Sequence, residues 1–120
     1  MPEATEKAAG GLLTPQWRTR PGYMLHLAEG IKQAVSVPVI AAGKLHDPDL
    51  CEQALQEGKT DLIGIARGFM ADPDWVRKAQ AGRKEDIVMC TACGGCHRDL
   101  RDQKPITCQV NPQLGHEYEA

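Results

Sequence analysis

The sequence predicts an α/β fold in which short parallel strands alternate with helices. Two apolar runs without polar alternation, at 37–41 and 61–66, have the pattern of strands buried on both faces. Each run is followed by an Asp-Pro dipeptide that opens a helical pattern, and each pattern ends at a glycine. Because a helix crosses between the two strands, we expect the strands to be parallel.

The chain begins with small and polar residues, and 1–20 are predicted to form a weakly ordered lead-in. The first helix is predicted just after Pro21, because a proline is tolerated near the start of a helix. Five apolar residues recur there at helical spacing and predict one buried face: Met24, Leu27, Ala28, Ile31 and Val35. The first strand follows, and Gly43 ends it.

The next two helices have start and stop signals of the same kind. In the second helix Asp47 is the predicted N-cap, Pro48 takes the first position, and Gly58 adopts the left-handed stop. The third helix, after the second strand and a loop, repeats these roles in the same order with Asp72, Pro73 and Gly82. The order helix–strand–helix–strand–helix corresponds to consecutive βα units.

The loops after the two strands carry candidate anion-binding groups. The carboxyl ends of neighbouring parallel strands meet at one edge, where α/β folds bind ligands. Gly43 allows close approach of the backbone, and Lys44 and Arg67 supply positive charge, Arg67 with two parallel donors. These features predict a phosphate site. The alternative is that both cations are solvated surface charges and that Gly43 only turns the chain.

Four of the five cysteines, Cys90, Cys93, Cys96 and Cys108, follow the spacing C-x2-C-x2-C-x11-C. Four thiolates typically hold an iron–sulfur cluster. Structural zinc also takes four cysteines, but its sites usually pair two separated C-x2-C turns, so the spacing favours a [4Fe–4S] cluster. A disulfide framework is the third and least favoured interpretation of the four cysteines. Cys51 has apolar neighbours at helical spacing and is predicted to be a core residue.

The composition limits the partners and the compartment. The 120 residues suit one small domain, and a net charge of −2 offers no case for binding nucleic acid or an anionic membrane. No apolar run approaches the roughly 20 residues of a membrane span, and the N-terminus lacks the pattern of a secretory signal. We therefore expect a cytoplasmic protein whose clustered cysteines are metal ligands or redox groups rather than paired disulfides.

Three motifs together carry a family resemblance. The segments "PVIAAGKL" and "ARGFMADPD", and the cysteine run followed by "NP", resemble the NADH:flavin oxidoreductases of the Old Yellow Enzyme class. The resemblance is greatest to the iron–sulfur branch, which includes 2,4-dienoyl-CoA reductase, enoate reductase and trimethylamine dehydrogenase. It covers about residues 21–117.

The resemblance implies a cofactor set and its ligands. The family fold is a TIM (βα)8 barrel that holds FMN, with the phosphate on the loops after strands seven and eight. Carried over, Gly43, Lys44, Ala66 and Arg67 would bind the FMN phosphate. The four clustered cysteines would hold a [4Fe–4S] cluster: Cys90, Cys93, Cys96 and Cys108. NAD(P)H and FAD would be bound only in a full-length relative.

The resemblance also implies that the chain is incomplete as an enzyme, because a TIM barrel needs about 250 residues. Residues 21–88 would be the C-terminal part of the barrel and 89–120 a loop-rich cluster segment. We expect the catalytic residues to lie outside this chain, and the remainder of the barrel or a partner chain to be needed. The alternatives are a stand-alone iron–sulfur electron carrier, a structural zinc module, or a truncated product without activity.

Overall fold

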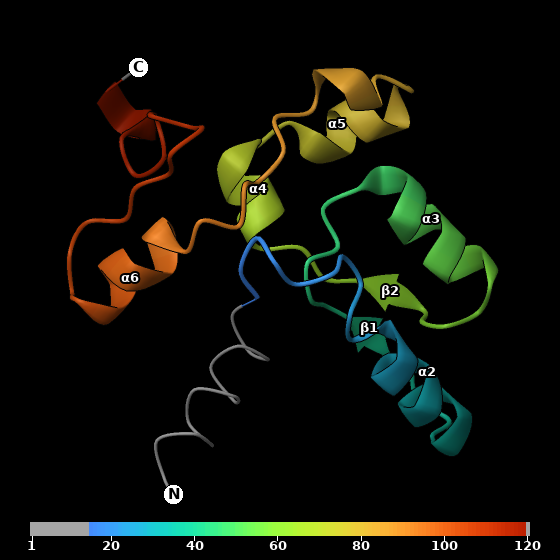
Figure 1. Cartoon of the computed structure of the whole chain (residues 1–120). Helices are drawn as coiled ribbons and strands as arrows, with labels where there is room; N and C mark the ends of the chain where they lie inside the picture. Colours follow the sequence, from blue (N-terminus) through green and yellow to red (C-terminus); the bar gives the residue numbers. More distant parts are fainter. Residues whose placement is uncertain (1–14, 120) are drawn as a thin grey trace, which may run out of the picture.

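The computed structural model describes residues 15–119, and most of the predicted lead-in, residues 1–14, lies outside the described residues. Its α/β part is built on a parallel pair of strands, β1 (Ile40–Ala41) and β2 (Leu62–Ile63), seen in Figure 1. In this pair Ile40 lies opposite Leu62 and Ala41 opposite Ile63. The predicted parallel arrangement is confirmed, although both strands are shorter than the predicted runs.

Helices flank the strands and continue into the C-terminal part of the chain, with the labels of Figure 1. In chain order the α-helices of the described residues are α2 (Leu25–Ala34), α3 (Pro48–Gln56), α4 (Arg67–Ala71), α5 (Trp75–Gln80) and α6 (Gly95–Arg101). Two 3₁₀ turns, η1 (Lys84–Asp86) and η2 (Glu117–Glu119), complete the assignment. The crossover from β1 to β2 is α3, as expected for a βαβ unit.

Helix α3 begins and ends at the predicted residues. The side chain of Asp47 accepts a hydrogen bond from the backbone N–H of Asp49 at 3.0 Å, and Pro48 opens the helix. Gly58 has a φ of +70° and lets the chain turn so that the N–H of Lys59 donates to the carbonyl of Ala54 at 3.0 Å. The cap and the left-handed stop therefore satisfy backbone groups that the helix ends leave unpaired.

The predicted third helix is shorter than expected, and an additional helix precedes it. The stretch after β2 that was expected to be a loop forms α4, and the next helix, α5, starts at Trp75 rather than at Pro73. Asp72 ends α4, and its carboxylate accepts the N–H of Asp74 at 3.0 Å in the turn between the helices. Gly82, with a φ of +68°, ends α5 as predicted.

The core lies between one face of the sheet and helices α2, α3 and α5. Its buried members are Leu25, Ala28, Ala41, Leu45, Cys51, Ala54, Trp75 and Ile87. Cys51 is 6% exposed, so its predicted place in the core is confirmed. Burial, reinforced by the nearby Asp47 carboxylate, raises the pKa of this thiol to about 11, and Cys51 stays protonated at neutral pH.

The other face of the sheet is open in the described chain. Ile40 is 63% and Leu62 52% exposed, so the expectation of strands buried on both faces is wrong for this structure. The predicted apolar face of α2 is also largely exposed, since Leu27 and Ile31 both face solvent. The reason is common to both: no described segment covers these surfaces, and the molecule is flat, with extents of 48 × 46 × 25 Å.

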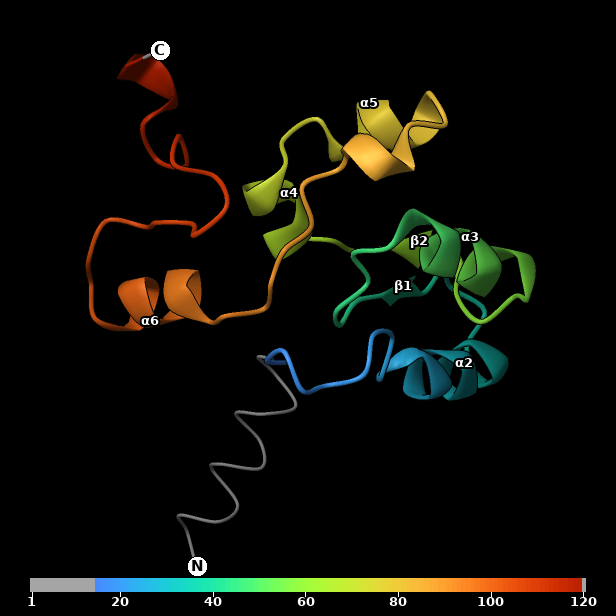
Figure 2. The same cartoon turned by 45° about the horizontal axis from the view of Figure 1, so that its top comes forward.

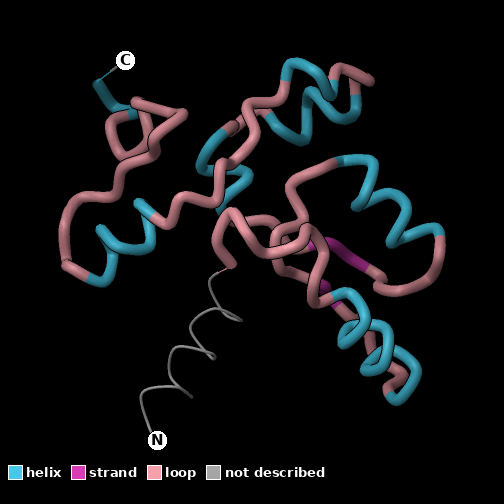
Figure 3. The backbone as a smooth tube through the Cα atoms, viewed as in Figure 1, coloured by secondary structure: helices cyan, strands magenta, loops and turns pink. Residues whose placement is uncertain are grey.

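The cysteine segment lies on the far side of α4 from the sheet, and it keeps this position in the views of Figures 1 and 2. Figure 3 shows that it is mostly loop, as predicted, with α6 as an additional helix that the sequence pattern does not reveal. Among residues 15–119, no helix has the length and apolar character needed to cross a bilayer.

Candidate functional site

The first predicted phosphate loop follows β1 and turns sharply. Gly43 and Lys44 both have positive φ angles, 120° and 53°. A Cβ atom on Gly43 would lie 3.1 Å from side-chain atoms of Tyr23 and Met24. Glycine is therefore required here both by the backbone conformation and by the close approach of the segment before α2. The second loop follows β2, with Ala66 as the N-cap of α4 and Arg67 as its first residue.

Lys44 and Arg67 are directed at the same stretch of backbone, residues 15–19. Arg67 donates from Nη1 to the carbonyl oxygen of Pro15 at 2.8 Å. Lys44 donates from Nζ to three carbonyl oxygens, those of Gln16, Trp17 and Thr19. The structure thus brings together the two predicted cations at adjacent strand ends. Their binding of a phosphate stays a prediction.

His46 lies beside these two cations, although the sequence gives it no role. Its side chain is buried, and its carbonyl oxygen accepts a hydrogen bond from the indole of Trp75 at 2.8 Å. Burial lowers the pKa of His46, and the positive charges of Arg67 and Lys44 lower it further. His46 is therefore neutral at pH 7, and both cations act on the same point near the strand ends.

All four clustered cysteines line one pocket that is partly open to solvent. Arg67 and Met70 of α4 line the same pocket, so it touches the second phosphate loop. The four cysteines around it are Cys90, Cys93, Cys96 and Cys108. Within the part of the chain that the structure describes, no three His, Cys, Asp or Glu side chains are grouped closely enough to hold a single metal ion.

Backbone N–H groups surround the cysteine sulfurs. The N–H of Ala92, a residue with a left-handed φ of 53°, donates to Sγ of Cys90 at 3.4 Å. Cys93 has a lowered pKa, first because of a hydrogen bond from the N–H of Gly95, and it is exposed. The turn after Cys93 therefore favours, at this residue, the thiolate form that a metal requires.

Cys96 shows that three of the sulfurs share one electrostatic environment. Burial is the largest cause that raises the pKa of Cys96, and nearby Cys90 and Cys93 raise it further. Arg67 lowers the same pKa. Negative charge on Cys90 or Cys93 therefore disfavours the thiolate of Cys96, and a cationic group among the three sulfurs would favour it.

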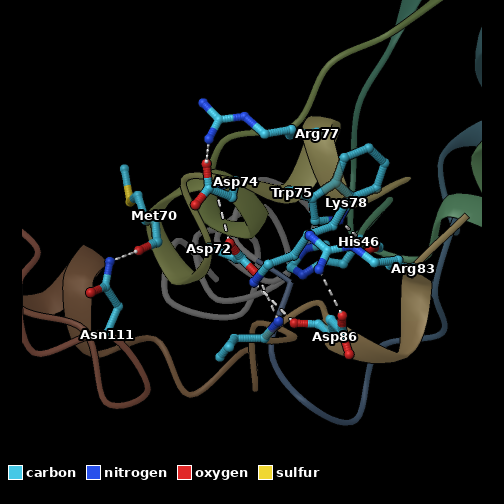
Figure 4. Close-up of polar contacts among 11 residues, drawn as sticks. His46, Met70, Asp72, Asp74, Trp75, Arg77, Lys78, Arg83, Asp86 and Asn111 are labelled. Atoms are coloured by element: carbon cyan, nitrogen blue, oxygen red, sulfur yellow. Dashed lines mark hydrogen bonds and ion pairs between the residues drawn. The ribbon is translucent and has the colours of Figure 1, made fainter. Parts of the chain in front are cut away.

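Asn111 attaches the cysteine segment to the barrel-like part of the chain. Its side-chain amide donates to the carbonyl of Met70 at 2.8 Å, across 41 positions of sequence, as Figure 4 shows. Asn111 belongs to the "NP" pair that follows the last cysteine. The sequence pattern gives it no partner, and the contact explains how the cysteine pocket is held against α4.

The chain was compared with known proteins. Residues 11–86 match the NADH:flavin oxidoreductase / NADH oxidase family. The chain is 50% identical over 100 residues to a metal reductase from Desulforamulus reducens, with 82% of this chain and 15% of that protein covered. It is 38% identical over 112 residues to an NADH oxidase from Thermoanaerobacter brockii, with 88% and 16% covered.

A solved structure supports the same assignment. The complex of 2-naphthoyl-CoA reductase with 2-naphthoyl-CoA superposes with a TM-score of 0.83 at 39% identity, covering 87% of this chain and 16% of that one. This chain therefore spans about a sixth of the length of the proteins it matches. The open sheet face is consistent with a partial TIM barrel. The chain belongs to the NADH:flavin oxidoreductase / NADH oxidase family.

Proposed function

We propose that this chain is the FMN-phosphate-binding and [4Fe–4S]-binding part of a flavin-dependent NAD(P)H oxidoreductase. The observation that carries the proposal is the pocket that Arg67 lines together with all four clustered cysteines. In this pocket the side chain of Arg67, a predicted phosphate ligand, lies beside the four thiols. When bound, the flavin would exchange hydride with nicotinamide or with an activated alkene, and the cluster would pass single electrons.

The residues at the strand ends fit a phosphate group. Lys44 and Arg67 approach one point from adjacent loops. The neutral ring of His46 adds no positive charge that would repel these two side chains. A phosphate oxygen is a stronger acceptor for ammonium and guanidinium groups than the backbone carbonyls that occupy them in this structure. Gly43 keeps a side chain away from the turn, and Ala66 contributes backbone at the start of α4.

The cysteine pocket fits an iron–sulfur cluster better than a single zinc ion. In a zinc site all four sulfurs lie about 2.3 Å from one atom. In a four-iron cluster each cysteine binds a different iron, so the thiols surround a larger body. The four cysteines line one pocket, yet no three of the described ligand side chains are grouped closely enough for a single ion, and the N–H of Ala92 donates to Sγ of Cys90, a kind of contact that tunes clusters.

We further propose that the remainder of a barrel, from the same protein or a partner chain, covers the open apolar surfaces. Ile40 and Leu62 form the exposed sheet face, and Leu27 and Ile31 the exposed side of α2. Edges and apolar faces of this kind are unfavourable in water. A closed barrel removes both. The catalytic groups and the nicotinamide site would lie in that remainder.

A stand-alone iron–sulfur electron carrier is the second candidate. It is favoured by one observation: all four cysteines of the pocket come from this chain. Flavin content separates the two candidates, since a carrier would show the absorbance of the cluster without bound FMN. A structural zinc module would instead give zinc and a colourless sample.

Replacing Arg67 with Ala is expected to weaken FMN binding about tenfold or more, because charge-assisted hydrogen bonds contribute about 1.5–3 kcal/mol. Arg67→Lys keeps the charge but loses the two-pronged donor geometry, so its effect should be intermediate. Fluorescence titration of FMN, with the segment that completes the barrel present, measures both. Arg77→Ala is the matched control, because Arg77 is exposed and forms an ion pair with Asp74 on the surface of the described chain. Unchanged FMN affinity in Arg67→Ala would remove Arg67 from the phosphate site.

A further inference from the structure

Asp99 is a buried carboxylate that joins the two segments carrying the last two cysteines. It lies on α6, one turn after Cys96, and is 7% exposed. Its Oδ2 accepts the backbone N–H of Thr107 at 3.1 Å and also the hydroxyl of Thr107. Thr107 immediately precedes Cys108 and itself lines the cysteine pocket. One carboxylate oxygen therefore holds the residue next to the fourth cysteine by both of its donors.

The backbone of Asp99 closes the same loop. The N–H of Lys104 donates to the carbonyl oxygen of Asp99 at 2.8 Å. Gln103 takes a left-handed φ of 56°, and its N–H donates to the carbonyl of Leu100 at 3.2 Å. The chain therefore leaves α6 in a tight turn and returns along it. The eleven residues between Cys96 and Cys108 are folded back on Asp99 by its main chain and its side chain together.

The negative charge of Asp99 strengthens its hydrogen bonds with Thr107. The hydroxyl of Thr107 is the largest cause of the lowered pKa of Asp99, and the neighbouring Arg98 and Lys104 add to it. Burial tends to raise the pKa of Asp99, but the net effect of all these contacts is to lower it. Asp99 is a carboxylate at neutral pH, and hydrogen bonds to an ionised acceptor are about twice as strong as neutral ones.

We propose that Asp99 is a positioning residue that, through Thr107, fixes Cys108 beside Cys96 so that the four thiols can act as one ligand set. The proposal rests on the proposed function, in which these cysteines hold a [4Fe–4S] cluster. Asp99 itself does not touch the cluster in this account. Its role is to fix the position of Cys108, the fourth ligand. The short spacings that keep the first three cysteines close together do not constrain Cys108.

The test compares four variants of the whole chain after anaerobic reconstitution with iron and sulfide. Thr107→Val removes the hydroxyl and keeps the shape and the backbone N–H, whereas Thr107→Ser keeps the hydroxyl. Asp99→Asn removes the charge. The matched control is Asp102→Asn, because Asp102 is exposed, pairs with Arg101 and does not line the pocket. Iron release to a chelator and the electron paramagnetic resonance spectrum are measured.

We expect iron release to be about 10–100-fold faster in Asp99→Asn and Thr107→Val, the range found when groups that orient metal ligands are changed. After loss of one Fe²⁺ and one-electron oxidation by added ferricyanide, their spectra should show the signal of a three-iron cluster, because the fourth ligand is the one displaced. Thr107→Ser and Asp102→Asn should behave as the unmodified chain. Equal release in all variants would overturn the role of Asp99 while leaving the cluster in place.

A second measurement separates this proposal from the cluster itself. Hydrogen exchange at the Thr107 amide reports the contact with Asp99 in the metal-free chain. It should be slow in the unmodified chain and in Thr107→Ser, and about tenfold faster in Asp99→Asn. If the unmodified chain takes up no iron, the proposed function fails, and the amide exchange still decides whether Asp99 holds the return segment. Exchange that is equally fast in the unmodified chain and in Asp99→Asn would overturn the proposal.

Discussion

Replacing Cys93 with Ser is expected to reduce the iron retained by the chain at least about tenfold, since changes to outer groups alone already cost about 10–100-fold in metal affinity. Cys93 is the central cysteine of the run, and the N–H of Gly95 lowers its pKa, which favours the thiolate form that binds iron. Serine has no comparable acidity and binds iron poorly. Iron and acid-labile sulfide are measured after anaerobic reconstitution.

The matched control is Cys51→Ala. Cys51 is buried in the core, its Sγ lies 3.6 Å from the carbonyl oxygen of Leu45, and its thiol has a pKa of about 11. It is expected to take no part in metal binding, so Cys51→Ala should keep its iron despite some loss of stability. If Cys93→Ser and Cys51→Ala retain equal iron, the clustered cysteines are not the ligands.

Replacing Asp72 with Ala is expected to lower the free energy of unfolding by about 3 kcal/mol, because it breaks a buried ion pair and leaves its partners unsatisfied. The carboxylate of Asp72 is 3% exposed and accepts from Lys78 at 2.6 Å, from the N–H of Val88 at 2.9 Å and from the N–H of Asp74 at 3.0 Å. Figure 4 shows this network between α4 and α5. Urea unfolding of the metal-free chain measures the loss.

The same network predicts a dependence on pH. Burial works against the charge of Asp72, but the hydrogen bond from Lys78 and the two backbone N–H groups outweigh it and lower its pKa. A lowered pKa means that the stabilisation is present above the unfolded value of about 3.9 and is lost as the pH falls through the folded value. Below about pH 4, Asp72→Asn should therefore lose less further stability than the unmodified chain.

Asp74→Ala is the control for the Asp72 variants. Asp74 pairs with Arg77 at 3.0 Å on the surface, where ion pairs contribute about 1 kcal/mol or less. Its replacement should change the unfolding free energy by no more than that. A loss in Asp72→Ala as small as the loss in Asp74→Ala would mean that the Asp72 network does not join α5 to the segment that enters the cysteine pocket.

Local sequence signals predicted the helix ends correctly where the capping contacts are made within one turn of the helix. Asp47, Pro48 and Gly58 bound α3 as expected, because cap and stop act within one turn. Asp72 was predicted to begin a helix, but it ends α4 and opens the turn before α5. Its carboxylate has distant partners, Lys78 and Val88, which a local pattern cannot reveal.

Burial was less predictable than secondary structure. The apolar runs indicate burial on both faces, which is the state of a strand in a closed barrel. In this chain Ala41 is buried under the helices and Ile40 is exposed. This pattern is the one expected if the proposed remainder of the barrel covers the open sheet face, and the exposed side of α2 fits the same proposal.

The sequence identified the candidate ligands of the site, but not the residues that surround these ligands and hold them in place. Spacing identified the four cysteines, and strand ends identified Lys44 and Arg67, which the structure brings to one stretch of backbone. Three supporting groups lie far from their partners in sequence or look like surface residues: His46, Asp99 and Asn111. The sequence signals none of the three, because helix α6, which places Asp99 one turn after Cys96, is not revealed by the sequence pattern.

The most direct test of the central claim is a metal and sulfide analysis of the anaerobically purified chain. The account predicts four irons and four sulfides per chain, with the broad visible absorbance of a [4Fe–4S] cluster. A single zinc ion in a colourless protein would contradict it. So would four thiols that remain open to alkylation while iron and sulfide are present.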